Sequence, residues 1–507
     1  MLKSNRHFFQ RLVAAIKKWL FLVPFIVFLC LYGLIFSGRA RIYSDRSYYL
    51  RYHIAEFEIK EKLSGEYKLV VFRKDKPVKG IGDRIVYDFL SGGDKSSAKF
   101  PIPWNAEKGF YEARVFHPDG KERRRFLPLT FAVTGREPGQ VTFPLNAVTW
   151  ENTKPLDKIK IPVPSGEVKS WKGIFDWVEF TGANTLLYLA GQTAFYGKSL
   201  PPDFPWIKNN MAFLDKMCDE ARARKIRIGA WIASYIIIGS RDSGLGYRYG
   251  IDYSIRDDAL KTRRGISIGD EKRLRDIIKA ARRIDVSDVD FIGLDYIRPV
   301  QGGLELVDDF LSEMQIEFPE NLGTKEDRML YLGREIYRDK NYKLMDLWNW
   351  WRAHKTSEIL VRVREEVKSD KPLWIFLLSW QMGHQHGQDP VMFQDAGADF
   401  QTVMLYECDG RQFERLIRQW REYDARGVNF VVGNQVDFPV HQFTEDPPAP
   451  QEFGRRIREA KKVMKAKGVF VNDLSRALWG RKGPYSTLEW LAPLKKEFIK
   501  QPAPDNP

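Results

Sequence analysis

Eight short apolar segments in the second part of the chain constrain its fold most strongly. They occupy residues 147–151, 185–190, 227–233, 290–299, 373–380, 401–407, 430–435 and 468–473. Apolar runs this short are typical of parallel strands that are buried on both faces. Amphipathic stretches long enough for helices lie between them, at residues 213–224, 272–283, 351–368, 412–426 and 453–467. Eight strand–helix units predict an α/β fold, a (β/α)8 TIM barrel over residues 144–480.

An open doubly wound sheet is the alternative to the barrel. That fold binds nucleotides through a glycine-rich turn after its first strand, and no such turn follows residues 147–151. Two connections are long, residues 237–270 and residues 300–345. Long loops on the catalytic face of a barrel usually shape a cleft or a lid.

The N-terminal segment has the pattern of a membrane anchor. Residues 1–18 are basic without any acid, and residues 19–36 form an uncharged run of 18 residues, so we predict a transmembrane signal anchor over residues 19–37. The basic residues before the apolar run favour a cytoplasmic N-terminus. Arginines after the run reduce the difference in positive charge between its two flanks, which weakens this prediction. A signal peptide cleaved after Ala40 is the alternative, but the apolar core is long for one. The bulk of the chain is therefore expected to be periplasmic or extracellular.

Residues 43–137 are expected to form a small β-sandwich of immunoglobulin-like type. Strand-like runs at residues 67–72, 84–89, 109–116 and 129–133 are separated by turn signals. The segment holds no catalytic cluster, which suits a spacer or a carbohydrate-facing accessory domain. Residues 481–507 are expected to be a C-terminal tail.

The composition narrows the choice of partners. A formal net charge of +15 favours acidic partners, such as an anionic polysaccharide or a phospholipid surface. No nucleic-acid-binding motif accompanies this charge, so no nucleic-acid partner is predicted. The three cysteines form no Cys-x-x-Cys pair and no disulfide framework.

Carboxylates gather where the predicted strands end. They are Glu151, Asp295, Glu407, Asp409, Asp437 and Asp473. Hydrolysis of a glycosidic bond needs two carboxyl groups, one to protonate the leaving oxygen and one to attack or to activate water. Asp295 and Glu407 stand two strands apart, so they are expected to face one another as the catalytic pair.

In this hypothesis Asp295 is the nucleophile or charge stabiliser and Glu407 is the general acid/base. Tyr296 or Arg298 would keep Asp295 ionised, whereas the apolar residues before Glu407 would raise its pKa. Purely structural roles compete: Asp295 can cap a helix or pair with Arg298, and Glu407 can be a hydrogen-bond partner. Asp409 is a rival for the acid role.

Aromatic and amide side chains at the strand ends suit a sugar. Tyr188 and Tyr235 belong to the same aromatic set, in which core packing explains any one member, but a set at strand ends fits sugar stacking better. The residues expected to contact substrate are Trp150, Trp231, Tyr296, Arg298, Trp380, His384, His386, Tyr406, Asp409, Asn434, Gln435 and Asp437.

The His384-Gln-His386 pair has three interpretations: a metal site, a substrate contact or a loop hydrogen bond. No second histidine cluster follows another strand, so no metal or other cofactor is predicted and substrate contact is favoured. No Gly-x-Ser-x-Gly elbow is present to indicate a serine hydrolase.

Several of these segments resemble a known family. Ser-Ile-Gly-Asp-Glu at residues 267–271, Asp-Tyr-Ile-Arg at 295–298, Trp-Arg at 351–352 and the strand ending in Met-Leu-Tyr at 404–406 resemble the glycosyl hydrolase-like family 10 barrels. The similarity covers residues 145–475, and a more distant one is to the clan of α-galactosidases. The resemblance implies a retaining or transglycosylating glycosidase. The third loop and the histidine pair depart from the pattern, so the substrate does not carry over.

Three functions follow from these patterns. The leading one is a membrane-anchored extracytoplasmic glycoside hydrolase that acts on a cell-surface or exported polysaccharide, with an anionic one favoured by the charge. The second is a non-catalytic polysaccharide-binding or assembly protein with a degenerate barrel. The third is a metal-dependent hydrolase or deacetylase centred on His384 and His386.

Overall fold

The structure is a computed structural model that describes residues 40–60, 63, 66–83, 86–88, 90–92, 95–123, 125–195, 205–239, 244–299, 302–380, 383–406, 410–438 and 448–499. The predicted basic segment 1–18 and the predicted anchor 19–37 lie outside the described residues. Among the described residues, no helix is both long and apolar enough to cross a bilayer.

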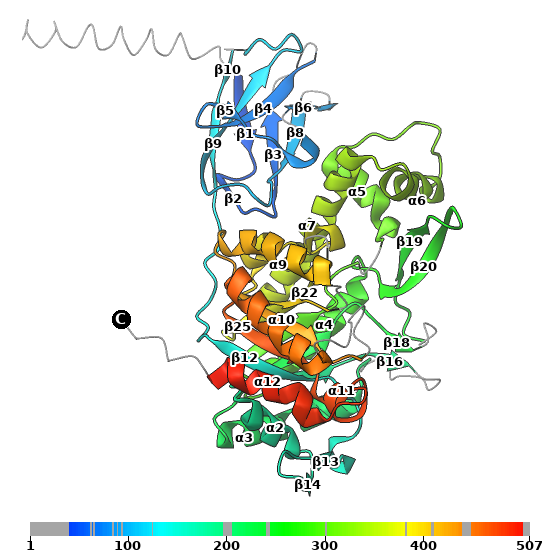
Figure 1. Ribbon diagram of the computed structural model, residues 1–507. Coiled ribbons are helices and arrows are strands. Elements are labelled where there is room, and N and C mark those ends of the chain that lie inside the picture. Colours follow the sequence, from blue (N-terminus) through cyan, green and yellow to red (C-terminus); the bar gives the residue numbers. More distant parts are fainter. Residues whose placement is uncertain are drawn as a thin grey trace, which may run out of the picture.

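Eight parallel strands of the described chain close into one barrel (Figure 1). In ring order they are β12 (Leu145–Trp150), β15 (Thr185–Gly191), β17 (Arg227–Ala233), β21 (Phe291–Asp295), β22 (Leu373–Leu378), β23 (Phe400–Met404), β24 (Phe430–Gln435) and β25 (Gly468–Asn472). Pairing of β25 with β12, with Gly468 opposite Leu145, closes the ring. The eight predicted strands are confirmed, and the open doubly wound sheet is excluded.

Alternate residues of each strand point into the barrel, where they form one buried cluster. Leu187, Trp231, Phe291 and Phe470 belong to this inner cluster, and their neighbours along the strands pack outward against the helices. A side chain at Gly293 would collide with the inner cluster, because its Cβ would lie 2.3 Å from the Trp374 ring. The two-residue alternation therefore decides which strand-end side chains face the mouth of the barrel.

Helices surround the barrel. They are α2 (Gly173–Thr181), α3 (Lys208–Ala223), α4 (Glu271–Asp285), α5 (Val307–Met314), α6 (Lys325–Gly333), α7 (Tyr342–Val367), α8 (Pro390–Ala396), α9 (Gly410–Asp424), α10 (Ala449–Met464), α11 (Leu474–Trp479) and α12 (Thr487–Ile499). Short helical turns are η1 (Ile81–Asp83), η2 (Leu156–Lys158), η3 (Leu304–Leu306), η4 (Arg334–Arg338) and η5 (Gly383–His386). The segment expected to be a C-terminal tail contains α12, which packs against α10 and α2 through buried side chains such as Trp490.

Small two-stranded sheets decorate the barrel. They are β13 (Ile161–Pro162) with β14 (Val168–Lys169), β16 (Ala194–Phe195) with β18 (Ile238–Gly239), and β19 (Tyr249–Ser254) with β20 (Ala259–Ile266). The last pair lies within the long connection 237–270, and α5 and α6 lie within the connection 300–345. Figure 1 shows β16, β18, β19, β20, α5 and α6 on its right-hand side, which is the side of the carboxyl ends of the barrel strands.

The N-terminal part folds into two sheets that share one core. One sheet has the order β10 (Phe126–Leu127), β1 (Ala40–Ser44), β3 (Ile54–Ile59), β8 (Lys95–Pro101), β7 (Leu90–Gly92). The other has the order β2 (Tyr48–Tyr49), β11 (Leu129–Val133), β9 (Gly109–Phe116), β4 (Lys68–Arg73), β5 (Lys76–Pro77), with β6 (Val86–Asp88) on β4. Phe57, Phe100, Tyr111 and Phe131 from both sheets meet in this core. The immunoglobulin-like type stays a prediction.

The two-sheet part docks on the barrel through buried polar contacts. The Arg51 guanidinium donates two hydrogen bonds of 2.8 Å to the Asp395 carboxylate of α8, and both side chains are buried. Trp350 of α7 donates to the backbone carbonyl of Ile102 at 3.0 Å. Because a buried charge without its partner is costly, these contacts fix how the two parts sit together.

Candidate active site

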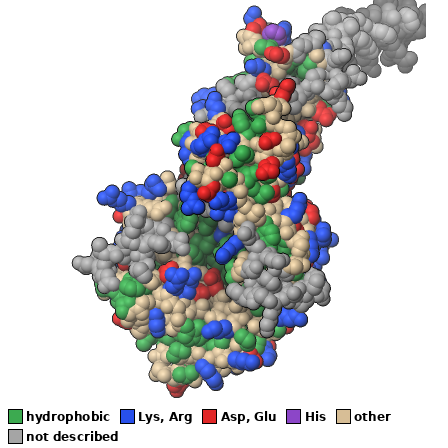
Figure 2. All heavy atoms as spheres, turned by 90° about the vertical axis from the view of Figure 1, so that its right-hand side faces the viewer, with side chains coloured by type: hydrophobic (Ala, Val, Ile, Leu, Met, Phe, Trp, Pro, Cys, Tyr) green, Lys and Arg blue, Asp and Glu red, His purple; other side chains and the backbone are tan. Residues whose placement is uncertain are grey.

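The carboxyl ends of the barrel strands open into a hollow. Figure 2 faces the right-hand side of Figure 1 and shows this hollow with Asp and Glu atoms in its floor and Lys and Arg atoms beside it. Residues at inward positions of the strands reach this mouth. In barrel enzymes the active site lies at the carboxyl ends of the strands, so this face is the candidate active site.

Asp295 ends β21 at an inward position and is buried. One of its carboxylate oxygens accepts hydrogen bonds from the Tyr296 backbone amide (2.6 Å) and from the Arg298 guanidinium (3.2 Å). Burial raises the pKa of Asp295, while the Arg298 charge opposes that rise. The sequence left open whether Asp295 would pair with Arg298, and in the structure it does so at the mouth.

Tyr296 has a left-handed backbone conformation, with φ of 53°. A bulky residue there costs about 1–2 kcal/mol, and such strain is concentrated at functional sites. The Arg298 guanidinium lies 4.5 Å from the centre of the Tyr296 ring, so the aromatic face holds the cation beside Asp295. Burial raises the pKa of the Tyr296 phenol to about 12, so the group is a neutral donor at physiological pH.

Glu151 directly follows β12, and the pKa of its carboxyl group is strongly raised. Burial, followed by the charges of Asp473 and Asp295, raises its pKa to about 8. The amide of Asn472, at the end of β25, donates to its carboxylate. The sequence placed Glu151 among the strand-end carboxylates but did not single it out, because burial and its charged neighbours are properties of the closed barrel.

Asp473 has a structural task at the same mouth. Its carboxylate caps α11 by accepting from the Arg476 backbone amide (2.6 Å) and from the Ser475 hydroxyl (2.9 Å). Burial raises its pKa, against the opposing effect of these hydrogen bonds. Asp473 therefore serves mainly to position α11 and to add negative charge near Glu151.

The amide residues of β24 contribute unequally. Gln435 points inward, and its side-chain oxygen accepts from the Arg476 guanidinium at 2.8 Å in the amide orientation that satisfies both groups. Asn434 is buried, and its side-chain oxygen accepts from the Gln435 backbone amide at 2.8 Å. Asp437 lies farther out, where Arg476 (3.7 Å) and Arg481 (3.3 Å) flank it. Gln435 and Asp437 thus share Arg476 as a partner, whereas Asn434 is bonded to the backbone.

The expected aromatic platform divides between two layers. Trp150 is fully buried in the outer layer, edge-on to Trp479 at 5.8 Å, which corrects the expectation of an open stacking face. Trp231 is buried inside the barrel against Phe376. Tyr188 and Tyr235 are also fully buried and belong to the outer layer. Aromatic side chains at strand ends are therefore mostly core here.

Two aromatic residues do lie at the mouth. The indole of Trp380 donates to the backbone carbonyl of Tyr406 at 3.4 Å. Burial and the charges of Glu151 and Asp295 raise the pKa of the Tyr406 phenol well above its ordinary value. Tyr406 therefore lies within electrostatic reach of both carboxyl groups.

His386 belongs to η5, and its imidazole Nε2 lies 2.8 Å from the backbone carbonyl of Trp380. The side chain of His384 lies outside the described residues, as do Glu407 and Asp409. Within the described ranges, no group of three or more His, Cys, Asp or Glu residues could hold a metal ion.

No protein-family model matches the sequence, and no curated protein sequence matches it. Among solved structures, the β-galactosidase from the psychrophilic Marinomonas ef1 is similar at 10% identity and a TM-score of 0.43, over 69% of this chain and 58% of that one. The glycoside hydrolase domain of PelA from Pseudomonas aeruginosa is similar at 10% identity and a TM-score of 0.34, over 64% of this chain and 94% of that one. The xylanase and α-amylase inhibitor XAIP-I, in complex with trehalose, is similar at 12% identity and a TM-score of 0.31, over 69% of this chain and 98% of that one.

These structural neighbours include glycoside hydrolases, but the likeness is too distant to decide an activity. The chain spans just over half the length of the β-galactosidase. The barrel assignment rests on the strand pairing described above, and the resemblance to glycosyl hydrolase-like family 10 stays a prediction.

Proposed function

We propose that this protein is a glycoside hydrolase acting on a cell-surface or exported polysaccharide. The observation that carries the proposal is the relation between Asp295 and Glu151 at the barrel mouth. Two carboxyl groups in different environments are what glycosidic hydrolysis requires. Glu151 has a pKa of about 8, whereas Asp295 has a cation as its direct partner.

These environments assign the roles. At neutral pH Glu151 is mostly protonated, so it is suited to donate a proton to the leaving glycosidic oxygen. Arg298 favours the ionised form of Asp295, which is suited to attack the anomeric carbon or to stabilise positive charge that develops there. In this proposal Tyr406, whose pKa both carboxylates raise, donates a hydrogen bond to the sugar.

Glu407 and Asp409 remain candidates for the acid, because they follow Tyr406 in the chain. Glu407→Gln is therefore the comparison for Glu151→Gln. The acid is the residue whose amide variant loses activity on unactivated glycosides while keeping its fold. A loss in Glu407→Gln alone would transfer the acid role to Glu407.

The test of the proposed function is release of reducing ends from a panel of acidic and neutral polysaccharides. The full-length protein in detergent is expected to release them, and Asp295→Asn is expected to lose about 10³-fold or more of the rate, as loss of a catalytic group does. Asp219→Asn, which alters an exposed carboxylate of α3 away from the mouth, is the matched control. Equal rates for wild type and Asp295→Asn would end the assignment.

We further propose that residues 19–37 anchor the protein in a membrane with the barrel outside the cytoplasm. The support is the uncharged run after a basic segment. A reporter enzyme active only outside the cytoplasm, fused after residue 507, is expected to be active. Activity of a reporter that works only in the cytoplasm, fused at the same position, would show the opposite orientation.

A polysaccharide-binding protein without turnover is the second candidate. The observation that favours it is that two of the mouth carboxylates already have partners: Asp295 pairs with Arg298, and Asp473 caps α11. Binding of a polysaccharide with no reducing ends released, in both wild type and Asp295→Asn, would select this function.

A further inference from the structure

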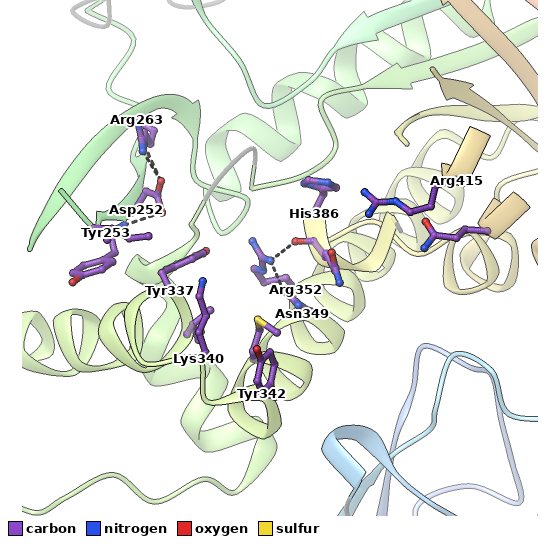
Figure 3. A pocket seen from close by; sticks show the side chains of 15 residues that line it. Asp252, Tyr253, Arg263, Tyr337, Lys340, Tyr342, Asn349, Arg352, His386 and Arg415 are labelled. Atoms are coloured by element: carbon purple, nitrogen blue, oxygen red, sulfur yellow. Dashed lines mark hydrogen bonds and ion pairs between the residues drawn. The ribbon is translucent and has the colours of Figure 1, made fainter. Parts of the chain in front are cut away.

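A second hollow lies among the connections that follow β17, β21, β22 and β23 (Figure 3). Its volume is about 800 Å³, which is large enough for a sugar residue and its substituents. β19, η4, α7, η5 and α9 all contribute to its wall. His386 lines the hollow and contacts the backbone carbonyl of Trp380, and the Trp380 indole in turn contacts the backbone carbonyl of Tyr406 at the barrel mouth.

The floor of this hollow holds a buried cation with neutral partners. Arg352 is 4% exposed, and it donates to the Gly302 carbonyl (3.2 Å), the Asn349 side chain (2.6 Å) and the Gln385 carbonyl (2.6 Å). Its Nε has no hydrogen-bond partner in the described part of the chain. Burial lowers the pKa of Arg352, while the charge of Asp252 opposes that effect.

The rim adds further positive charge. Lys340 and Arg415 are exposed and line the hollow, as Figure 3 shows, and no carboxylate of the described residues pairs with either. The one acidic residue in the wall, Asp252, is paired with Arg263 at 2.6 Å. Arg352, Lys340 and Arg415 therefore surround one space, and none of the three forms an ion pair with a carboxylate of the described residues.

An aromatic wall stands beside these cations. The rings of Tyr253 and Tyr337 are nearly parallel, at 14°, with centres 6.4 Å apart. Both residues line the hollow. Aromatic faces next to fixed guanidinium groups suit a ligand that has both a flat ring surface and an anionic substituent.

We propose that this hollow is a subsite for an acidic sugar residue, whose anionic group is bound by Lys340 and Arg415 and attracted by the buried charge of Arg352. The proposal rests on the proposed function, since the subsite holds one part of the polysaccharide that reaches the barrel mouth. The exposed guanidinium of Arg415 can bind a carboxylate or a sulfate in the same forked geometry, so the two kinds of acidic sugar share this chemistry. The contact of His386, in the wall of the hollow, with Trp380 at the mouth shows that the hollow adjoins the mouth.

Binding of oligogalacturonate to full-length protein in detergent tests the proposal by calorimetry. The measurement uses the Asp295→Asn variant, so that hydrolysis does not consume the oligomer. Comparison with the wild-type protein checks that the variant is folded. The methyl-esterified oligomer has the same backbone without the charge, and a sulfated oligosaccharide of similar length tests the other anion. We expect one of the two acidic oligomers to bind tightly. The methyl ester should bind at least about tenfold more weakly than the acid, because it cannot form charge-assisted hydrogen bonds.

The variant Lys340→Gln/Arg415→Gln is expected to bind the preferred acid about tenfold more weakly, because both side chains are exposed and only the anion contact is lost. Arg421→Gln, on the same helix as Arg415 but outside the hollow, is expected to bind as the parent does. The anion that binds more tightly, carboxylate or sulfate, identifies the class of acidic sugar that the subsite binds.

Equal binding of the acid and its methyl ester would overturn the proposal. So would an equal effect of Arg421→Gln, since that indicates only long-range attraction to a basic surface. Binding is measured without turnover, so the result stands even if the protein is not a glycosidase. Conversely, absence of selective binding in the hollow would not contradict the roles proposed for Asp295 and Glu151.

Discussion

Glu151 directly follows β12 and Asp295 ends β21, three strands apart in the barrel, and the negative charge of Asp295 raises the pKa of Glu151. The effect requires that both carboxyl groups face the same mouth. It also links the protonation of one to the charge of the other, as coupled carboxylates in catalytic sites do.

This relation predicts the basic limb of the pH–activity profile. A general acid with a pKa of about 8 is protonated below that pH and loses its proton above it. We expect kcat/KM to fall as the pH rises through about 8. A profile that stays flat to pH 10 would contradict the assignment of Glu151, since the groups remaining in the mouth would then supply the proton.

The same pKa predicts how stability depends on pH. In the unfolded chain Glu151 titrates near its ordinary pKa, so between that value and about 8 the folded state binds more protons than the unfolded state. The penalty from this group is absent at low pH and grows as the pH rises through this window. Glu151→Gln removes it, so urea unfolding should show the variant gaining stability relative to wild type between pH 5 and pH 8, and no such trend would refute the buried environment.

Arg298 is predicted to set the acidic limb. Its positive charge favours the ionised form of Asp295, so Arg298→Gln should raise the pKa of Asp295 further. The acidic limb of kcat/KM should move to higher pH, while Arg298→Lys, which keeps the charge, should move it less. An unmoved limb in Arg298→Gln would mean that Asp295 is not the group that titrates there.

Docking of the two-sheet part on the barrel is predicted to depend on Asp395. Asp395→Ala leaves the buried Arg51 guanidinium without its counter-charge, so the free energy of unfolding should fall by about 3–5 kcal/mol. Glu414→Ala removes an exposed pair with Arg418 and should cost less than about 1 kcal/mol. Similar losses in both variants would show that the interface contact is no stronger than a surface ion pair.

Gly293 is predicted to be required by packing inside the barrel. A Cβ there would lie 2.3 Å from the Trp374 ring and 2.7 Å from Trp231 Cβ, so Gly293→Ala should destabilise by about 1–3 kcal/mol through overpacking. Gly323→Ala, where no atom lies within 4 Å of the new Cβ, serves as the control. Thermal unfolding of the two variants measures the difference, and equal midpoints would mean that the inner cluster adapts freely.

The eight strands could be predicted because short buried strands leave a local signature in the sequence, and β17 and β24 match their predicted bounds. The layer in which each aromatic residue lies could not be predicted with the same ease. Trp150 and Trp231 both stand near a strand end, but one points to the helices and the other into the barrel, since their registers within the strands differ.

Contacts between residues far apart in the chain could not be predicted from local sequence patterns. Arg51 and Asp395 are 344 residues apart, and nothing near either residue marks it as a partner of the other. Glu151 was visible as a strand-end carboxylate, but its raised pKa arises from burial and from Asp473 and Asp295, which only barrel closure brings near. The hollow around Arg352 likewise needs four separate connections to meet.

The central claim is that Glu151 and Asp295 act as acid and partner carboxylate across the barrel mouth. The most direct test compares Glu151→Gln with wild type on two glycosides of the sugar that the polysaccharide panel identifies, one with a dinitrophenyl leaving group and one with a sugar leaving group. The account predicts near-normal cleavage of the dinitrophenyl glycoside, which needs no proton, and a loss of about 10²-fold or more on the sugar leaving group. Equal losses on both substrates, or no loss on either, would contradict it.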